Sequence, residues 1–215
     1  MNMKTQVART HYQFGRYMHK RRWTSVWHQL DEVIRTGAQT VLEIGPGPGL
    51  FKAVSAIFGL DVETVDIDPA LMPDYVASAM ELPLADNSKD VTVAFQMLEH
   101  LPYDLSLVAF REMVRVSSRH IIISLPDARE MWFYSIYIPK VGDFRFMLPK
   151  PARKLKEHIF DGQHYWEVNK RGYELKKIIN DLTAQGVALV RTFQVGENPY
   201  HRFFMFEKPA GILLK

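Results

Sequence analysis

The sequence predicts an α/β fold with a mainly parallel sheet. Three observations predict it: an apolar run enters a glycine-rich turn at residues 41–49, a second apolar run ends in an acid at position 66, and strand-like and helix-like segments alternate through the rest of the chain. The 215 residues, 47% of them hydrophobic, suit one domain with one substantial core, and we expect residues 1–215 to form it.

Apolar periodicity predicts the individual elements in order. A helix ending at Gly37 precedes the glycine-rich turn, and its apolar residues are expected to form one core stripe: Trp23, Val26, Trp27, Leu30, Val33 and Ile34. Further helices are predicted at 50–58, 104–116 and about 175–182, and strands at 62–66, 91–95 and 120–125. Two final β-rich runs, 188–194 and 202–207, predict an antiparallel hairpin that ends the sheet.

The glycine-rich turn, with Gly45, Gly47 and Gly49, is suited to hold a ligand directly on the backbone. Its spacing is G-x-G-x-G, whereas dinucleotide-binding turns use G-x-G-x-x-G. Glu43 would repel a pyrophosphate but attract the cationic amino-acid end of S-adenosylmethionine. Taken alone, the pattern remains compatible with an ordinary glycine-rich turn of an α/β protein.

Two further motifs follow in order. Asp66 ends the next predicted strand about 20 residues after the glycines, where an acid accepts hydrogen bonds from ribose hydroxyls. Residues 77–102 then run through a strand into Glu99-His100-Leu101. With these motifs, residues 40–126 resemble the class I S-adenosylmethionine-dependent methyltransferases, in particular the type 11 group. The resemblance implies a Rossmann-like methyltransferase fold with a mainly parallel seven-stranded sheet.

The resemblance also implies which residues hold S-adenosylmethionine. The cofactor-binding residues expected from it are Glu43, Gly45, Gly47, Gly49, Asp66, Ile67, Ser78, Ala79, Met80, Gln96 and Met97. In the family pattern an acid that meets the adenine often stands where this chain has Ser78, so this contact departs from the pattern.

Composition excludes several classes of chemistry. The chain has no cysteine, which rules out disulfides, thiolate metal sites, iron–sulfur clusters and cysteine nucleophiles, and the sequence predicts no metal site. The longest apolar runs are far shorter than the roughly 20 residues that span a bilayer, and the N-terminal residues lack a signal-peptide core. A cytoplasmic location is the expectation.

Two segments outside the motifs are expected to shape the substrate site. Residues 127–167 form a long connection rich in aromatic and basic residues, which predicts a lid over a small-molecule acceptor of aromatic, acyl or anionic character. The alternative is an insertion whose aromatic residues complete the core. Residues 1–37 are expected to form an N-terminal flap and helix whose basic residues begin at Lys4, and with a net charge of +3 nucleic acid is a second, less favoured partner.

Few catalytic residues are needed to transfer a methyl group from a sulfonium, because positioning supplies much of the rate. The best candidate for a general base is His164, with Glu167 to orient it, and His100 is a weaker candidate that also suits a structural role. His11 and Tyr12 are weaker still. The sequence thus predicts an O- or N-methyltransferase for a small molecule; the alternatives are an RNA or other nucleic-acid methyltransferase and a noncatalytic cofactor-binding protein.

Overall fold

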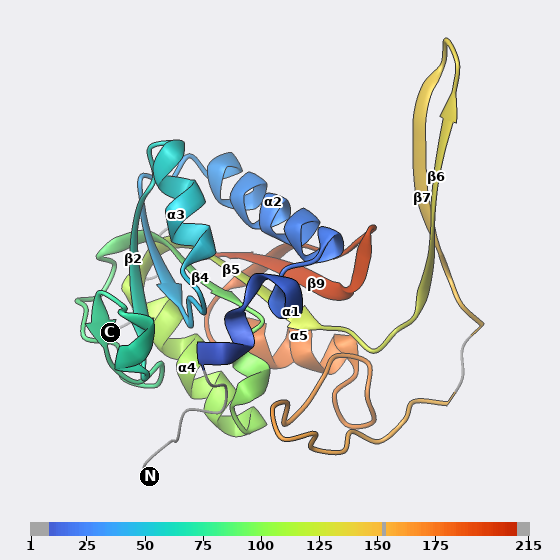
Figure 1. Cartoon of the computed structure of the whole chain (residues 1–215). Helices are drawn as coiled ribbons and strands as arrows, with labels where there is room; N and C mark the ends of the chain where they lie inside the picture. The colour runs from blue at the N-terminus through green and yellow to red at the C-terminus, as the bar shows by residue number, and fades with distance from the viewer. Residues whose placement is uncertain (1–8, 152–153, 210–215) are drawn as a thin grey trace.

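The computed structural model describes residues 9–151 and 154–209 and contains one seven-stranded sheet between two layers of helices (Figure 1). The strands are β1 (Thr40–Ile44), β2 (Asp61–Asp66), β3 (Tyr75–Val76), β4 (Lys89–Phe95), β5 (Ser117–Pro126), β8 (Ala188–Val195) and β9 (Asn198–Glu207), in the order β3-β2-β1-β4-β5-β9-β8. The first five strands pair in parallel, and β9 runs antiparallel to both β5 and β8. The predicted Rossmann-like methyltransferase fold with its antiparallel C-terminal hairpin is confirmed.

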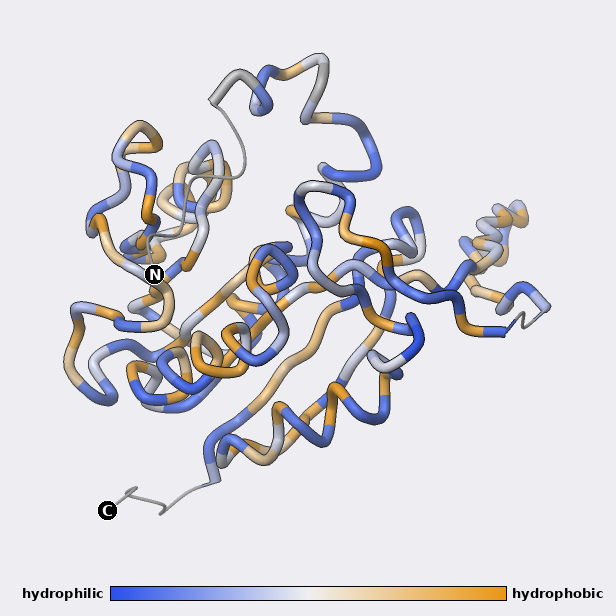
Figure 2. Tube along the Cα trace, turned by 90° about the horizontal axis from the view of Figure 1, so that it is seen from below, coloured by the Kyte–Doolittle hydropathy of each residue, from blue (hydrophilic) through white to orange (hydrophobic). Residues whose placement is uncertain are grey.

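Helices cover both faces of this sheet. The α-helices are α1 (Phe14–Tyr17), α2 (Lys20–Arg35), α3 (Leu50–Ile57), α4 (Tyr103–Val116) and α5 (Leu175–Thr183), and short 3-10 helices lie at η1 (Arg9–Tyr12), η2 (Pro69–Leu71) and η3 (Leu98–His100). One apolar cluster joins α2 and α3 to the sheet, and a second joins α4 and α5 to the opposite face. Figure 2 shows the alternation of hydrophobic and hydrophilic residues along the helices that produces these two buried faces.

The apolar stripe of α2 is narrower than its sequence predicts. Val26, Leu30 and Val33 are buried, whereas Trp23 and Trp27 are 51% and 55% exposed. Ile34 is also exposed, so the expectation that all six residues belong to the core is wrong for half of them. The reason is that a helix lying on one face of a sheet turns only a single stripe inward, while periodicity in the sequence does not fix the width of that stripe.

The described residues of 127–167, which leave out 152–153, form a hairpin followed by an irregular stretch. Strands β6 (Met131–Ile138) and β7 (Gly142–Pro149) pair with each other in a separate two-stranded sheet that extends away from the main body (Figure 1). At its base, Lys150 donates through its backbone N–H to the carbonyl of Glu130, and their side chains form an ion pair of 2.6 Å.

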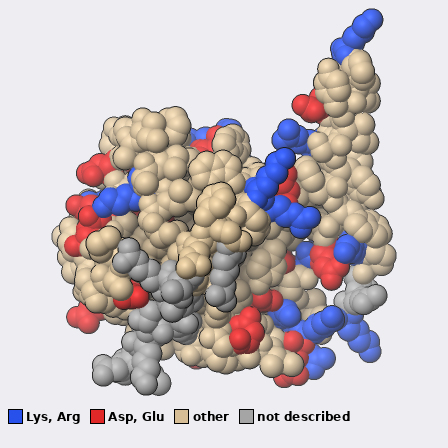
Figure 3. Space-filling view, viewed as in Figure 1, with Lys and Arg blue, Asp and Glu red and all other residues tan. Residues whose placement is uncertain are grey.

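The hairpin has one apolar face. Cross-strand pairing places seven large apolar side chains on the same side, each between 40% and 48% exposed: Trp132, Tyr134, Ile136, Ile138, Phe144, Phe146 and Leu148. On the other side Phe133 and Met147 are half-buried, and a Cβ at Gly196 would lie 2.5 Å from the Phe133 ring. Figure 3 shows a mainly uncharged hairpin with Lys or Arg side chains near its tip and base.

Candidate functional site

The glycine-rich turn connects β1 to α3 at the carboxyl edge of the sheet. Gly45, Gly47 and Gly49 have φ values of 70°, 54° and 73°, which side chains rarely tolerate. A Cβ at Gly45 would lie 2.4 Å from Cγ of Met97, and one at Gly47 would lie 3.2 Å from the Tyr12 ring. The turn therefore requires glycine for its conformation and, at these two positions, for the close approach of a neighbouring side chain.

Glu43 lies beside this turn with an unsatisfied carboxylate. It is 4% exposed, and its Oε2 atom has no hydrogen-bond partner among the described residues. Burial raises the pKa of Glu43 to about 8, and the charge of Lys52 opposes the shift only partly. A cationic ligand group at this position would satisfy the oxygen and favour the ionised form of the carboxyl group.

Asp66 ends β2, the strand beside β1. Its Oδ1 atom accepts a hydrogen bond of 2.8 Å from the Asp68 backbone, and burial raises its pKa. Ile67 follows it and is half-buried. Ala77 donates through its N–H to the Asp66 carbonyl, which brings the adjoining segment 78–80 to the same edge. There, Ser78 accepts a hydrogen bond from the Met80 backbone, and Ala79 is buried.

Gln96, directly after β4, has a φ of 55° although it is not glycine. Its backbone N–H donates to the Ser124 carbonyl at 2.9 Å, and its side-chain amide donates to the Ser124 hydroxyl at 3.2 Å. These two bonds stabilise a backbone conformation that is unfavourable for glutamine, and Gln96 lines the same pocket as Gly45. Unfavourable conformations of this kind concentrate at functional sites.

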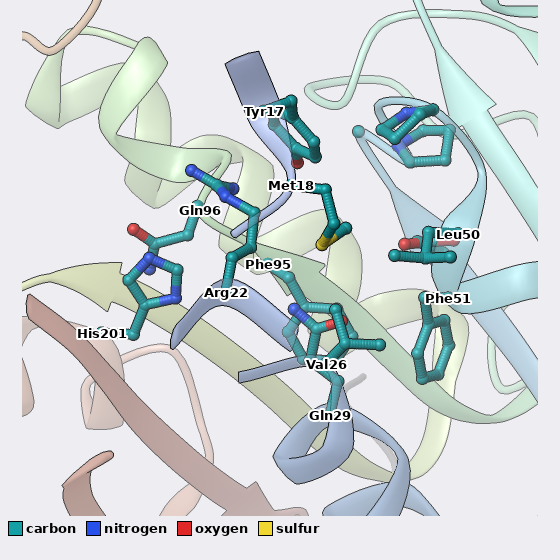
Figure 4. Close-up of a pocket in the computed structure, with 14 residues that line it drawn as sticks. Tyr17, Met18, Arg22, Val26, Gln29, Leu50, Phe51, Phe95, Gln96 and His201 are labelled. Atoms are coloured by element: carbon teal, nitrogen blue, oxygen red, sulfur yellow. The ribbon is translucent and has the colours of Figure 1, made fainter. Parts of the chain in front are cut away.

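A pocket lies between the glycine turn and the N-terminal helices. Among the expected cofactor-binding residues, Glu43, Gly45 and Gln96 line it, whereas Asp66 and residues 78–80 lie farther along the same edge of the sheet. Figure 4 shows Gln96 and His201 on one side of the pocket and Leu50 and Phe51 on the other. The positions of Tyr17, Met18, Arg22 and His201 in the wall have no counterpart in the sequence motifs.

The N-terminal helices cover the glycine turn. Tyr12 contacts Gly47, and its ring packs edge-on against Tyr17 with centroids 5.0 Å apart. Burial, with smaller contributions from Tyr17 and Asp66, raises the pKa of Tyr12 to about 12. His11 packs on both tyrosine rings. Residues 9–18 thus lie over the predicted cofactor floor, while Lys4 is outside the described residues.

The structure brings His100 and His164 together from positions 64 residues apart in the chain. Their ring centroids are 5.1 Å apart. The Nδ1 atom of His164 lies 3.2 Å from Oε1 of Glu167, as predicted for an orienting acid, and Tyr200 donates its hydroxyl to the same oxygen. Burial lowers the pKa of His164, but the bond to Glu167 and nearby acids outweigh it and the net pKa is raised. Burial also lowers the pKa of His100, to about 4.

Glu99 completes this cluster and was not a candidate from the sequence. It is fully buried, neither of its carboxylate oxygens has a hydrogen-bond partner among the described residues, and burial raises its pKa to about 8. Its position beside His100 in the Glu-His-Leu motif was the available signal. Its proximity to the second histidine, His164, arises from the packing of segment 158–167 against η3.

Comparisons with known proteins agree with this architecture. Residues 42–120 match a family model described as a methyltransferase domain. A protein of Mycobacteroides abscessus named "uncharacterized methyltransferase" is 29% identical over 170 residues, which cover 71% of this chain and 59% of that protein. The chain therefore spans less than two thirds of that relative.

Two solved structures share the fold at low sequence identity. The magnesium protoporphyrin IX methyltransferase of Synechocystis PCC 6803, with bound SAM, has a TM-score of 0.59 at 14% identity and covers 94% of this chain and 90% of its own. The 1,6-didemethyltoxoflavin-N1-methyltransferase of Burkholderia thailandensis has a TM-score of 0.60 at 14% identity and covers 93% and 84%. The family match over residues 42–120, the strand order and these fold neighbours agree with the resemblance to class I S-adenosylmethionine-dependent methyltransferases that the motifs indicate.

Proposed function

We propose that this protein binds S-adenosylmethionine and transfers its methyl group to an oxygen or nitrogen atom of a small-molecule acceptor. The observation that carries the proposal is the unsatisfied Oε2 atom of Glu43 in a pocket whose floor is the glycine turn. This acid matches the cationic amino-acid end of the cofactor and would repel the phosphates of a dinucleotide. The fold neighbours with bound SAM support the assignment.

Each expected cofactor contact has a distinct role. Gly45, Gly47 and Gly49 give the methionine part access to the backbone, and Gln96 and Met97 border it from β4. Asp66 is the acceptor for the ribose hydroxyls. Ile67, Ser78, Ala79 and Met80 would border the adenine. A lid function of residues 127–167 remains part of the proposal and concerns the choice of acceptor.

The cofactor supplies an electrophilic methyl group on a sulfonium. The chain's own residues hold the two reactants in line and shield the site, because the positive charge disappears during transfer and positioning accounts for much of the rate. Residues 9–18 lie where they can cover the bound cofactor, with Tyr12 against Gly47. We assign the acceptor side of the site to His164, whose Nδ1 atom lies 3.2 Å from Oε1 of Glu167.

A small-molecule acceptor is favoured over nucleic acid. The fold neighbours named above include enzymes for a porphyrin and for a toxoflavin precursor. Aromatic side chains of Tyr17, Phe51 and Phe95 line the pocket. No helix among the described residues is long and apolar enough to cross a membrane. Base recognition would need side chains aimed at base edges, and phosphate contacts from a basic surface do not supply them.

The test has a binding stage and a transfer stage. Calorimetry should show binding of S-adenosylmethionine and S-adenosylhomocysteine and none of a nicotinamide dinucleotide. Methyl-labelled cofactor incubated with a small-molecule extract should then yield a labelled product by mass spectrometry, and the Asp66→Ala variant should yield less of it when the cofactor concentration is near the wild-type dissociation constant. Labelling of RNA instead would assign the nucleic-acid alternative, and cofactor binding without any labelled product would favour the noncatalytic one.

A further inference from the structure

A cluster of potential metal ligands adjoins the proposed methyl-transfer site. Glu99, His100 and His164 each contribute one ligand atom, and these atoms all lie within 4.8 Å of one another. Two of the residues come from η3, and the third comes from the irregular stretch before α5. Two imidazoles and one carboxylate are a donor set that binds divalent first-row transition metals, and open positions remain for a substrate.

The hydrogen bonds of both histidines fix their ring orientation. Nδ1 of His100 lies 3.1 Å from the carbonyl oxygen of Gln163, and Nδ1 of His164 lies 3.2 Å from Oε1 of Glu167. A carbonyl or carboxylate oxygen can only accept, so Nδ1 is the protonated nitrogen in each ring and Nε2 is the one that can bind a metal. Histidines that bind metals usually hold their second nitrogen in this way.

The carboxylate supplies an independent observation. Glu99 is 0% exposed, and both of its oxygens are without hydrogen-bond partners among the described residues. Burying a carboxyl group without hydrogen-bond partners carries a desolvation cost that nothing around it offsets. A bound cation would remove this cost by neutralising the charge and engaging the oxygens.

The surrounding backbone holds the three residues in place. The Glu99 carbonyl accepts a hydrogen bond of 2.8 Å from the Tyr165 backbone, and the indole of Trp166 donates to the Leu101 carbonyl at 3.1 Å. Trp166 is 1% exposed, so the segment that carries His164 is anchored in the core. The ligand atoms thus lie on parts of the chain that are packed together, as a preorganised site requires.

We propose that Glu99, His100 and His164 form a binding site for a divalent transition-metal ion, with Zn²⁺ or Mn²⁺ as the fitting class. Glu167 and Tyr200 are positioning residues that act through His164. This revises the sequence-based expectation that the chain has no metal site. Mg²⁺ and Ca²⁺ fit the donor set less well, because they prefer oxygen ligands throughout.

The metal cluster lies next to residues of the cofactor pocket, and the role that we assign to the metal rests on the proposed methyl transfer. Gln96, three residues before Glu99, and His201, next to Tyr200, both line the pocket at the glycine turn. A metal here would bind a hydroxyl oxygen of the acceptor and promote loss of its proton to solvent. That oxygen then forms the bond to the methyl carbon as the carbon–sulfur bond breaks, and the electron pair of this bond stays on the sulfur. The role favours an oxygen acceptor over nitrogen.

Metal binding is tested on the full chain without cofactor or acceptor. Protein stripped with a chelator should bind one equivalent of ZnCl₂ in calorimetry and one Mn²⁺ in electron paramagnetic resonance titrations. Glu99→Gln and His164→Gln should each weaken binding by roughly a hundredfold, and Glu167→Gln by roughly tenfold, as expected for a residue that orients a ligand. Glu99→Gln keeps the shape of the side chain, and its unfolding temperature shows whether the fold is intact.

A second histidine and glutamate pair provides the matched control. His120 and Glu207 lie 3.9 Å apart at the other end of β5, so His120→Gln and Glu207→Gln should leave the metal affinity unchanged. The metal site is overturned if stoichiometric binding is absent. It is also overturned if folded Glu99→Gln and His164→Gln bind the metal as tightly as the wild-type protein does. Calorimetry with S-adenosylmethionine on the same samples tests the proposed function separately, so either idea can fail alone.

Discussion

Met97 packs so tightly on Gly45 that a Cβ atom at position 45 would come within 2.4 Å of the Met97 Cγ atom. This contact joins the end of β4 to the end of β1, the two strands at which the order of the sheet reverses. Open α/β sheets bind their ligands in the crevice at such a point. Gly45 therefore affects both the shape of the turn and the distance between the ends of β1 and β4, which border the crevice.

Gly45→Ala should destabilise the fold and weaken cofactor binding. The left-handed backbone alone costs alanine about 1–2 kcal/mol, and displacement of Met97 adds to this. Gly59→Ala is the matched control, since Gly59 has a φ of 79° and a Cβ added there would meet no atom within 4 Å. Denaturant unfolding should show the larger loss for Gly45→Ala, and calorimetry should show weaker cofactor binding only there. Equal losses at both positions would mean that the Met97 contact has no energetic effect.

Asp66→Ala should weaken S-adenosylmethionine binding by about 1.5–3 kcal/mol, because charge-assisted hydrogen bonds to the ribose would be lost. Asp61→Ala is a suitable control, since Asp61 is an exposed acid at the opposite end of the same strand. Calorimetry on both variants measures the difference. An unchanged dissociation constant in folded Asp66→Ala would remove this residue from the cofactor site.

His201 should make stability depend on pH. Burial lowers its pKa to about 3, so the folded state keeps it neutral while the unfolded chain takes up a proton below about 6.5. The unfolded state then binds more protons, and this residue's contribution to stability falls as the pH drops. When the pH falls from 7 to 5, the free energy of unfolding of the wild type should therefore decrease by about 2 kcal/mol more than that of His201→Gln.

The quantity to compare is the difference in unfolding free energy between wild type and His201→Gln at each pH. Buried Glu43 and Glu99 have raised pKa values and oppose the effect of the histidine, but they do so in both proteins. Denaturant unfolding at pH 7, 6 and 5 measures this difference. A difference that stays constant across this range would show that His201 titrates alike in the folded and unfolded states.

The lid prediction for residues 127–167 can be tested by hydrogen exchange with and without S-adenosylhomocysteine and acceptor. Backbone amides at 131–149 should exchange quickly without ligands and slow down when both are bound. The amide of Tyr165, which is bonded to the Glu99 carbonyl, should be protected in both states and serves as an internal reference. Equal exchange at 131–149 in all states would argue against a lid.

Local patterns in the sequence were sufficient to predict the glycine turn and six of the seven strands of the main sheet, but neither β3 nor the β6–β7 hairpin. The glycines and Asp66 follow predicted strands directly, so parallel pairing alone brings them to one edge. Glu99 could not be predicted in the same way, since its significance depends on His164, a residue 65 positions later that η3 meets only through tertiary packing. The exposure of Trp23 and Trp27 depends likewise on which face of α2 meets the sheet, which periodicity leaves open.

The base of the β6–β7 hairpin is closed, so the hairpin can be replaced as one segment. Because Glu130 and Lys150 meet in a backbone hydrogen bond and an ion pair, the chain leaves and re-enters the domain at neighbouring points. The hairpin can be shortened, lengthened or exchanged without changing the order of the seven strands. If the hairpin selects the acceptor, as we propose, transplanting this one contiguous segment would change acceptor preference without altering the seven-stranded sheet.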